Sequence, residues 1–202
     1  MPRIPRNFRA DQCYHVINRG NGGATVFRQR DDYFAFVDMI ARSSERIPMR
    51  LLAACLMPNH FHLVVQPYQN EDLSHWMHWL MTAHVSRHRL RYKTIGHIWQ
   101  GRFKPFRIQH DAHLLSVMRY VERNALRAGL VQRAEHWRWG SLEWRRLARP
   151  KITVAESPVP LPEDWVEWVN QPQTDAELDA LRKCVNRQRA FGDARWVEQL
   201  KN

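Results

Sequence analysis

The chain has 202 residues, of which 44% are hydrophobic, and this is enough to bury the core of one domain. Its 31 Lys and Arg against 20 Asp and Glu give a net charge of +11, so we expect a polyanionic partner, either nucleic acid or an anionic membrane surface. The sequence contains no apolar run long enough to span a membrane and no apolar signal segment at its start. Its three cysteines lie far apart, which excludes a disulfide framework or a zinc knuckle and favours a reducing cytoplasm.

The charge is concentrated in the first three quarters of the chain. Residues 1–150 carry 24 Lys and Arg against 11 Asp and Glu, whereas residues 151–202 carry 7 against 9. Prolines at positions 150, 158, 160 and 162 predict an extended linker between them. We therefore predict a basic domain over residues 1–149, a Pro-rich linker over 150–164 and a C-terminal tail over 165–202.

Hydrophobic periodicity predicts seven elements in chain order. Strands are expected over residues 13–18, 50–56, 60–66 and 103–109, and helices over residues 31–46, 71–92 and 111–128. This order is that of a ferredoxin-like or RRM-like split βαβ unit with one extra helix. The predicted fold is therefore α+β, with an antiparallel sheet, helices on one face and the other face free for a ligand.

The third expected strand begins with a pair of histidines. Residues 57–65 read MPNHFHLVV. Successive side chains of a strand alternate between faces, so His60 and His62 share one face while Phe61 and Leu63 point to the other. Two imidazoles about 7 Å apart at Cα can converge on one metal ion. A single His-x-His pair also arises by chance, so other residues must support a metal site.

The third expected helix places Tyr120 and Asn124 four residues apart on one face. Tyrosine can form covalent enzyme intermediates, and the Asn amide oxygen is a hard ligand. The alternative is a half-buried tyrosine beside a solvated asparagine. Arginines at 119, 123 and 127 repeat along the same helix, and this spacing suits either a solvated face or a row of phosphate contacts.

Residues 98–107 (IWQGRFKPFR) interleave aromatic and cationic side chains. Single-stranded nucleic acid is held in this way, with cations on phosphates and aromatic rings under bases. The aromatic residues of this segment can equally belong to the core. On the second expected helix, His84 and His88 lie one turn apart, and we expect them to be solvated or to face nucleic acid rather than to bind metal.

Together these segments resemble the REP-associated tyrosine transposases, a branch of the HUH single-strand transposase superfamily. The matching pieces are residues 19–21 (RGN), 57–62 (MPNHFH), 99–103 (WQGRF), 119–124 (RYVERN) and 127–131 (RAGLV). The resemblance extends from about residue 5 to residue 145. Residues 185–193 (VNRQRAFGD) also resemble the C-terminal segment of the family, though less sharply.

The resemblance implies a nucleophile and a metal site. Tyr120 maps to the nucleophile, which attacks single-stranded DNA to leave a 5′-phosphotyrosine and a free 3′-OH. His60 and His62 map to the metal ligands, with Asn124 as the third. Mg²⁺ or Mn²⁺ suits this mixed set, although imidazoles also accept Zn²⁺, Co²⁺ or Ni²⁺. The family's substrates are hairpin-forming repetitive extragenic palindromes with a short recognition sequence beside the hairpin.

We expect the DNA contacts to come from the basic and polar residues of these matching pieces. They are Arg19, Asn21, Trp99, Gln100, Arg102, Lys104, Arg107, Arg123 and Arg127. The expected partner is single-stranded or hairpin DNA, with no membrane and no small-molecule substrate. The branch favours a monomer over a dimer, located in the cytoplasm with the nucleoid.

Two other functions stay open at this point. One is another HUH endonuclease, such as a replication initiator or a relaxase, although the second tyrosine or third histidine that those enzymes often carry is not apparent. The other is a catalytically silent module that binds hairpin DNA or RNA.

The tail keeps aromatic residues, which indicates that it folds back on the domain, with residues 186–193 near the DNA-binding face. The alternative is that it packs on a distant surface and only stabilises the fold.

Overall fold

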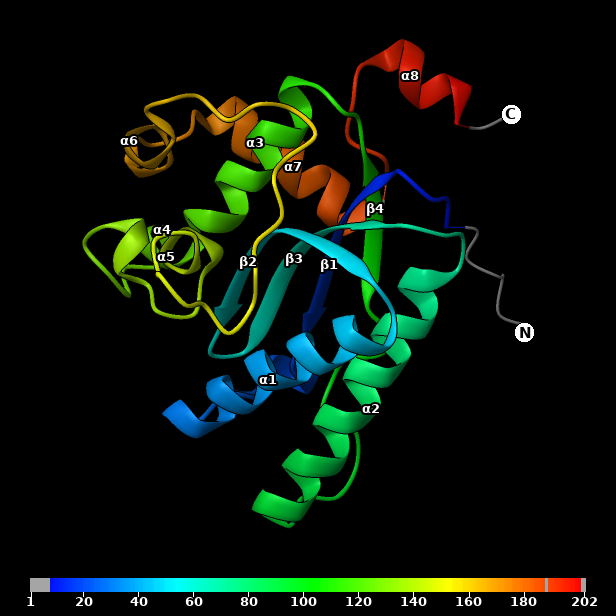
Figure 1. Ribbon diagram of the computed structural model, residues 1–202, viewed down its shortest axis with the longest axis vertical. Coiled ribbons are helices and arrows are strands. Elements are labelled where there is room, and N and C mark those ends of the chain that lie inside the picture. The colour runs from blue at the N-terminus through cyan, green and yellow to red at the C-terminus, as the bar shows by residue number, and fades with distance from the viewer. Residues whose placement is uncertain (1–7, 188, 201–202) are drawn as a thin grey trace.

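The computed structural model describes residues 8–187 and 189–200, and a four-stranded antiparallel sheet forms its centre (Figure 1). The strands are β1 (Cys13–Arg19), β2 (Met49–Met57), β3 (His60–Pro67) and β4 (Lys104–Ile108). Their spatial order is β2-β3-β1-β4, so the first strand lies between the third and the fourth. This is the split βαβ arrangement, and the predicted antiparallel α+β fold is confirmed.

One face of the sheet is covered by α1 (Arg30–Arg46) and α2 (Asp72–Tyr92). Side chains alternate between the two faces along each strand, and those that point to this side are almost all apolar. Phe36 of α1 packs against Phe61 of β3 with ring centroids 5.3 Å apart, and Trp76 of α2 is fully buried beside them. The helix α1 begins with a capping box between Gln29 and Asp32, which satisfies backbone N–H groups of its first turn.

The opposite face was expected to be free for a ligand, and the structure corrects this expectation. It is covered by α3 (Ala112–Glu122) and α4 (Asn124–Arg127) together with α6 (Trp165–Asn170) and α7 (Asp175–Arg187) (Figure 1). The apolar stripe of α3 requires a partner surface, which the sheet supplies on one side and Trp165, Val169 and Leu181 supply on the other. Only part of this face therefore remains open.

The remaining elements are short. They are η1 (Asn21–Gly23), η2 (Ala134–His136), α5 (Ser141–Trp144) and α8 (Ala194–Gln199). Asp111 caps α3 by accepting a hydrogen bond from the His113 backbone N–H, as the sequence predicts for this position. None of the helices within the described residues is long and apolar enough to cross a membrane.

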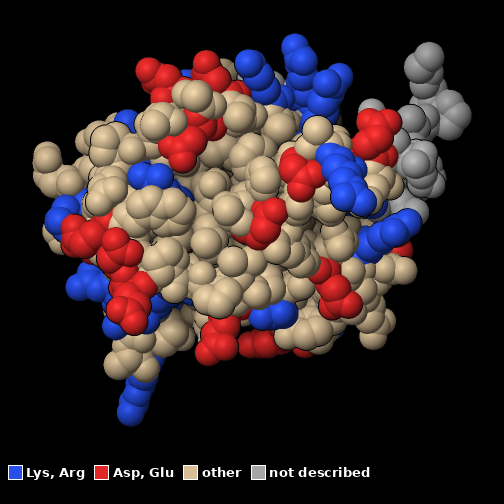
Figure 2. Space-filling model, turned by 90° about the horizontal axis from the view of Figure 1, so that it is seen from above, with Lys and Arg blue, Asp and Glu red and all other residues tan. Residues whose placement is uncertain are grey.

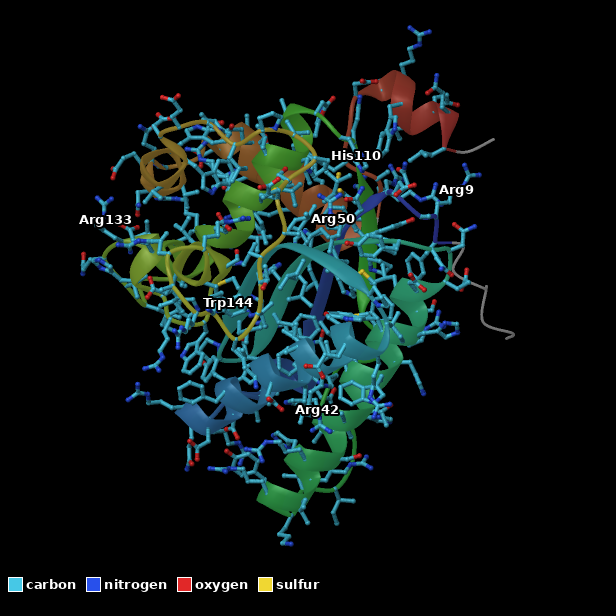
Figure 3. The ribbon with its side chains drawn as sticks, in the orientation of Figure 1. Arg9, Arg42, Arg50, His110, Arg133 and Trp144 are labelled. Carbon is cyan, nitrogen blue, oxygen red and sulfur yellow. The ribbon has the colours of Figure 1, made fainter. Side chains whose placement is uncertain are left out.

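The segment predicted as a linker lies against β2. The Ala155 N–H donates to the Leu51 carbonyl at 2.8 Å, and the Arg50 guanidinium donates to the Glu156 carbonyl at 2.7 Å (Arg50 is labelled in Figure 3). The segment is thus extended, and backbone and side-chain hydrogen bonds fix it to the sheet. The three domain boundaries stay a prediction.

The tail contacts α3 and then the edge of β4. The Trp165 indole N–H donates to the buried Glu122 carboxylate at 2.7 Å. Phe191 forms an isolated parallel bridge with Ile108, and its N–H donates to the Arg107 carbonyl at 2.8 Å. Of the predicted segment 186–193, residue 188 and the side chain of residue 186 lie outside the described part. Figure 2, which views the molecule from above Figure 1, shows acidic and basic side chains interspersed on that face.

Candidate active site

A cavity of about 500 Å³ opens where β1 and β3 meet the end of α3. It brings together His60 and His62 from β3 with Tyr120 from α3, although these residues are far apart in the sequence. The side chains around it are mainly polar or basic. The cavity is lined by Ile17, Asn18, Arg19, His60, His62, Gln100, Gly101, Arg102, Lys104, Tyr120, Arg127 and Val185.

The two histidines have their Nδ1 atoms engaged behind the cavity. His60 Nδ1 lies 2.6 Å from Asn59 Oδ1, and His62 Nδ1 lies 2.8 Å from His15 Nε2. Asn59 Oδ1 can only accept, so His60 carries its proton on Nδ1 and its Nε2 keeps a free lone pair. The two rings have centroids 4.9 Å apart, and the His62 ring lies 5.8 Å from that of Tyr120.

Burial keeps both imidazoles neutral. Burial, with the Arg19 and Arg127 charges adding to it, lowers the pKa of His60 to about 4. Burial and then the neighbouring His15 and His60 rings hold the pKa of His62 well below its ordinary value. The neutral ring is the form that binds a metal, so a positive charge does not prevent either histidine from acting as a ligand at neutral pH.

Tyr120 lies beside a single arginine. Arg127 donates from Nη2 to Tyr120 Oη at 3.4 Å and to Asn124 Oδ1 at 3.1 Å, and its guanidinium lies 4.6 Å from the centre of the tyrosine ring. A positive charge in this position stabilises negative charge on the phenolic oxygen. The helix α3 ends at Glu122, so Tyr120 lies in its last turn, and Asn124 begins the next short helix after Arg123.

The residues fit a divalent metal at the histidine pair. His60 and His62 share the cavity and offer neutral imidazoles. Asn124 is buried and does not line this cavity; among the described residues its Nδ2 has no hydrogen-bond partner, and its Oδ1 keeps a second lone pair beside the bond from Arg127. Within the described residues no three His, Cys, Asp or Glu side chains form a metal cluster.

Five of the predicted DNA contacts surround this cavity. They are Arg19, Gln100, Arg102, Lys104 and Arg127. Arg19, Arg102 and Lys104 are exposed at its rim, where guanidinium and ammonium groups can reach phosphate oxygens. Asn21 is also exposed, in the η1 turn, although it does not line the cavity.

Three other predicted contacts lie elsewhere. The Trp99 ring is only 4% exposed, and it packs against Phe61 and His84 in the core, so neither of its faces is open to a base. Arg107 alternates with Phe106 on β4 and therefore points to the opposite face of the sheet from the histidine pair. Arg123 donates to the Val169 and Asn170 carbonyls at the end of α6. These positions do not support the predicted contacts, which stay untested.

The structure also corrects the environment expected for two sets of side chains. His84 and His88 are buried at 4% and 6% exposure against aromatic residues of α1 and α2, rather than solvated. Arg119 is buried and donates to the Trp168 and Gln171 carbonyls, so it is part of the contact with the tail.

Sequence reasoning missed His15 and Val185. His15 lies on β1 behind His62, and the available signal was an additional histidine in the first strand, but pairing the two requires the strand register. Val185 of α7 lines the cavity, and its place depends on how the tail folds back.

A sheet with a histidine pair that faces a tyrosine on a helix, inside a basic cavity, is typical of the HUH tyrosine transposases. Residues 9–124 match the family described as Transposase IS200 like. The chain belongs to this family of transposases.

Two relatives agree with this assignment. A Haemophilus influenzae protein named as a REP-associated tyrosine transposase is 27% identical over 135 residues, which cover 61% of this chain and 70% of that protein. A solved structure of a REP-associated tyrosine transposase bound to a REP hairpin superposes with a TM-score of 0.58 at 18% identity, covering 76% of this chain and 90% of the other. The second comparison shows that the fold is shared.

Proposed function

We propose that this transposase cleaves and rejoins single-stranded DNA beside a repetitive palindromic hairpin, with Tyr120 as the nucleophile. The observation that carries the proposal is the meeting of His60, His62 and Tyr120 in one cavity with a basic rim. The relative solved with a REP hairpin supports hairpin DNA as the partner. Because His60, His62 and Tyr120 of one chain line the same cavity, this site needs none of the three from a second copy, and we propose that the protein acts as a monomer.

The reaction follows from the positions of these groups. The Tyr120 oxygen loses its proton and attacks the phosphorus, which forms a phosphotyrosine bond and breaks the P–O3′ bond. The leaving 3′ oxygen takes up a proton to become a 3′-OH. The reverse attack by a 3′-OH reseals the strand without ATP, because the phosphotyrosine conserves the bond. Arg127 stabilises the phenolate and then the phosphate oxygens beside it.

We propose that His60 and His62 hold Mg²⁺ or Mn²⁺, with Asn124 as a third ligand through Oδ1. When bound, the metal polarises and orients the scissile phosphate. Neutral ligands leave the full charge of the ion available to the substrate. Asn124 Oδ1 already accepts a bond from Arg127, so its contribution is expected to be smaller than that of either histidine.

A neighbouring groove offers a path for the single-stranded flank. It has a volume of about 990 Å³, runs along α2, and shares Gly101 and Arg102 with the catalytic cavity. Its lining combines half-buried, apolar Met81 and Ile98 with exposed, basic Arg89. A single strand requires this mixture of apolar surface for bases and cations for phosphates.

The test is covalent capture of the substrate. Wild-type protein, incubated with a labelled hairpin that carries a single-stranded flank and with Mn²⁺, should give an adduct on a denaturing gel. Tyr120→Phe should give none, because only the attacking oxygen is lost. The matched control Tyr68→Phe, at an exposed tyrosine outside the cavity, should behave as wild type. Adduct formation by Tyr120→Phe would rule out Tyr120 as the nucleophile.

A further inference from the structure

His15 is a fully buried polar side chain that lies directly behind the histidine pair. It sits on β1, whose register places Ile17 opposite His62, so His15 is the diagonal neighbour of His62 on the same face. The two rings are 5.0 Å apart at their centroids with an interplanar angle of 29°. The edge of the His15 ring packs against Phe106 at 4.7 Å, which fixes its orientation.

The contact between the two rings is a single hydrogen bond. His15 Nε2 and His62 Nδ1 are 2.8 Å apart, and one of the two must carry the shared proton. Two neutral arrangements are possible. In the first, His62 Nδ1–H donates to His15 Nε2. In the second, His15 Nε2–H donates to His62 Nδ1.

The two arrangements differ in what His62 presents to the cavity. A neutral imidazole carries one N–H. In the first arrangement the proton of His62 is on Nδ1, so Nε2 offers a lone pair. In the second, Nε2 of His62 carries the proton and cannot bind a metal. The orientation of this hydrogen bond therefore decides whether His62 is a ligand.

In the first arrangement the one proton of neutral His15 is on Nδ1, the nitrogen that does not bond to His62. His15 Nδ1 is buried and has no hydrogen-bond partner among the described residues. A buried polar atom without a partner is unfavourable, because it has lost its hydrogen bonds to water. A hydrocarbon ring would avoid that penalty, so a histidine here requires a reason beyond packing.

We propose that His15 is a positioning residue that accepts the Nδ1–H of His62 and so holds Nε2 of His62 ready for the metal. Asn59 has the same role for His60, because its amide oxygen accepts the Nδ1–H of that ring. Each ligand then has its own hydrogen-bond acceptor behind it, which fixes both tautomer and ring angle. The inference rests on the proposed metal site at His60 and His62.

Two measurements test this role. The first is ¹⁵N NMR of the histidine ring nitrogens in metal-free protein at pH 7.5, which reports the tautomer of His62 without any reaction. The second is Mn²⁺ affinity by calorimetry for wild type, His15→Phe and His15→Gln. His84→Phe is the matched control, because His84 is also a buried histidine, and it lies on α2, which covers the other face of the sheet.

The expected tautomer of His62 in wild type is Nδ1–H, and in His15→Phe it shifts towards Nε2–H. His15→Phe should weaken Mn²⁺ binding by about 10–100-fold, the usual effect of losing such a partner. His15→Gln should recover most of the affinity, since its amide oxygen can accept the same bond. His84→Phe should bind Mn²⁺ as wild type does.

Several outcomes would overturn the proposal. Protonation of His62 on Nε2 in wild type would do so, and this measurement needs no variant and so decides the matter if His15→Phe fails to fold. Wild-type Mn²⁺ affinity in a folded His15→Phe protein would also do so. Failure of the metal site itself has a separate signature, namely that His60→Ala binds Mn²⁺ as tightly as wild type.

Discussion

The two faces of the sheet carry different kinds of side chain, although the same strands supply both. On the α1 and α2 side, β3 contributes Phe61 and Leu63, which pack in a continuous apolar core. On the α3 side, the same strand contributes His60 and His62, which are backed by half-buried Asn59 and buried His15. Because side chains alternate along a strand, residues that stabilise the core and residues of the candidate site are neighbours in the sequence of β3. A substitution on one face should leave the property of the other face largely intact.

The side of the sheet that carries the cavity depends more on the C-terminal tail. Trp165, Val169 and Leu181 cover α3, and the tail also supplies hydrogen-bond partners to buried Glu122 and Arg119. Removing residues 151–202 should therefore lower the free energy of unfolding by about 5 kcal/mol or more, from lost burial and unsatisfied polar groups. Urea unfolding of the truncated and full chains measures this difference. Equal stability would show that the tail acts only at the DNA.

Two substitutions at neighbouring positions of β3 test most directly whether the two faces contribute separately to stability and to activity. Phe61→Ala should lower the free energy of unfolding by about 3–5 kcal/mol, with activity per folded molecule retained. His62→Ala should reduce metal-dependent cleavage by more than about 100-fold, since even an outer partner of a ligand contributes 10–100-fold. Urea titration and the adduct assay, run on both variants, separate the effects. The comparison fails if each variant loses both properties to the same degree.

Two arginines sharpen the distinction between a DNA contact and a structural contact. Arg102→Ala at the cavity rim should weaken hairpin binding by about 1–3 kcal/mol and reduce the slope of log affinity against log salt by about 1. Arg123→Ala, whose guanidinium binds α6 carbonyls, should leave that slope unchanged and lower the melting temperature instead. Fluorescence anisotropy with hairpin DNA over a salt series measures both slopes. An equal loss of slope in the two variants would place Arg123 on the DNA.

The smallest expected effect is a pH dependence from the α1 and α2 side. Burial, with His88 and Arg87 adding and Asp32 opposing, lowers the pKa of His84 to about 3. The unfolded chain then binds more protons than the native protein between about pH 6.5 and pH 3, so stability falls as pH falls through that window.

His84→Phe should flatten this dependence by about 1.4 kcal/mol per pH unit between those values. The measurement is the free energy of urea unfolding at several pH values for both proteins. At pH 7.5 the two should differ little in this respect. Parallel pH profiles would show that His84 is protonated in the native protein.

The local parts of the site could be predicted from the sequence, because they depend on local geometry. His60 and His62 share a face through strand alternation, and Tyr120 precedes Asn124 by one helical turn. The strands and long helices follow from apolar periodicity, and their observed bounds agree with the expected ones to within one residue, except that the helix expected over residues 111–128 ends at Glu122 and is followed by the separate short helix α4.

The missed parts depend on distant segments of the chain. Trp99 was ambiguous because an aromatic residue between cations has the same pattern in a core and under a base. Arg119 and Arg123 have the spacing of a basic helix face, but α6 carbonyls bind them, and only the folded tail shows this. His15 required the register between β1 and β3, which alternation alone does not define.

The anchoring of α3 has a consequence for the fate of the cut strand. Arg119, Glu122 and Arg123 surround Tyr120 in sequence, and each binds the tail. Under the proposed mechanism, a DNA end bonded to Tyr120 is held on a helix that the tail binds through these three residues. We expect the free 3′ end to be the DNA end that leaves the cavity. Its residence time there would then set the ratio between resealing of the original strand and transfer to another strand.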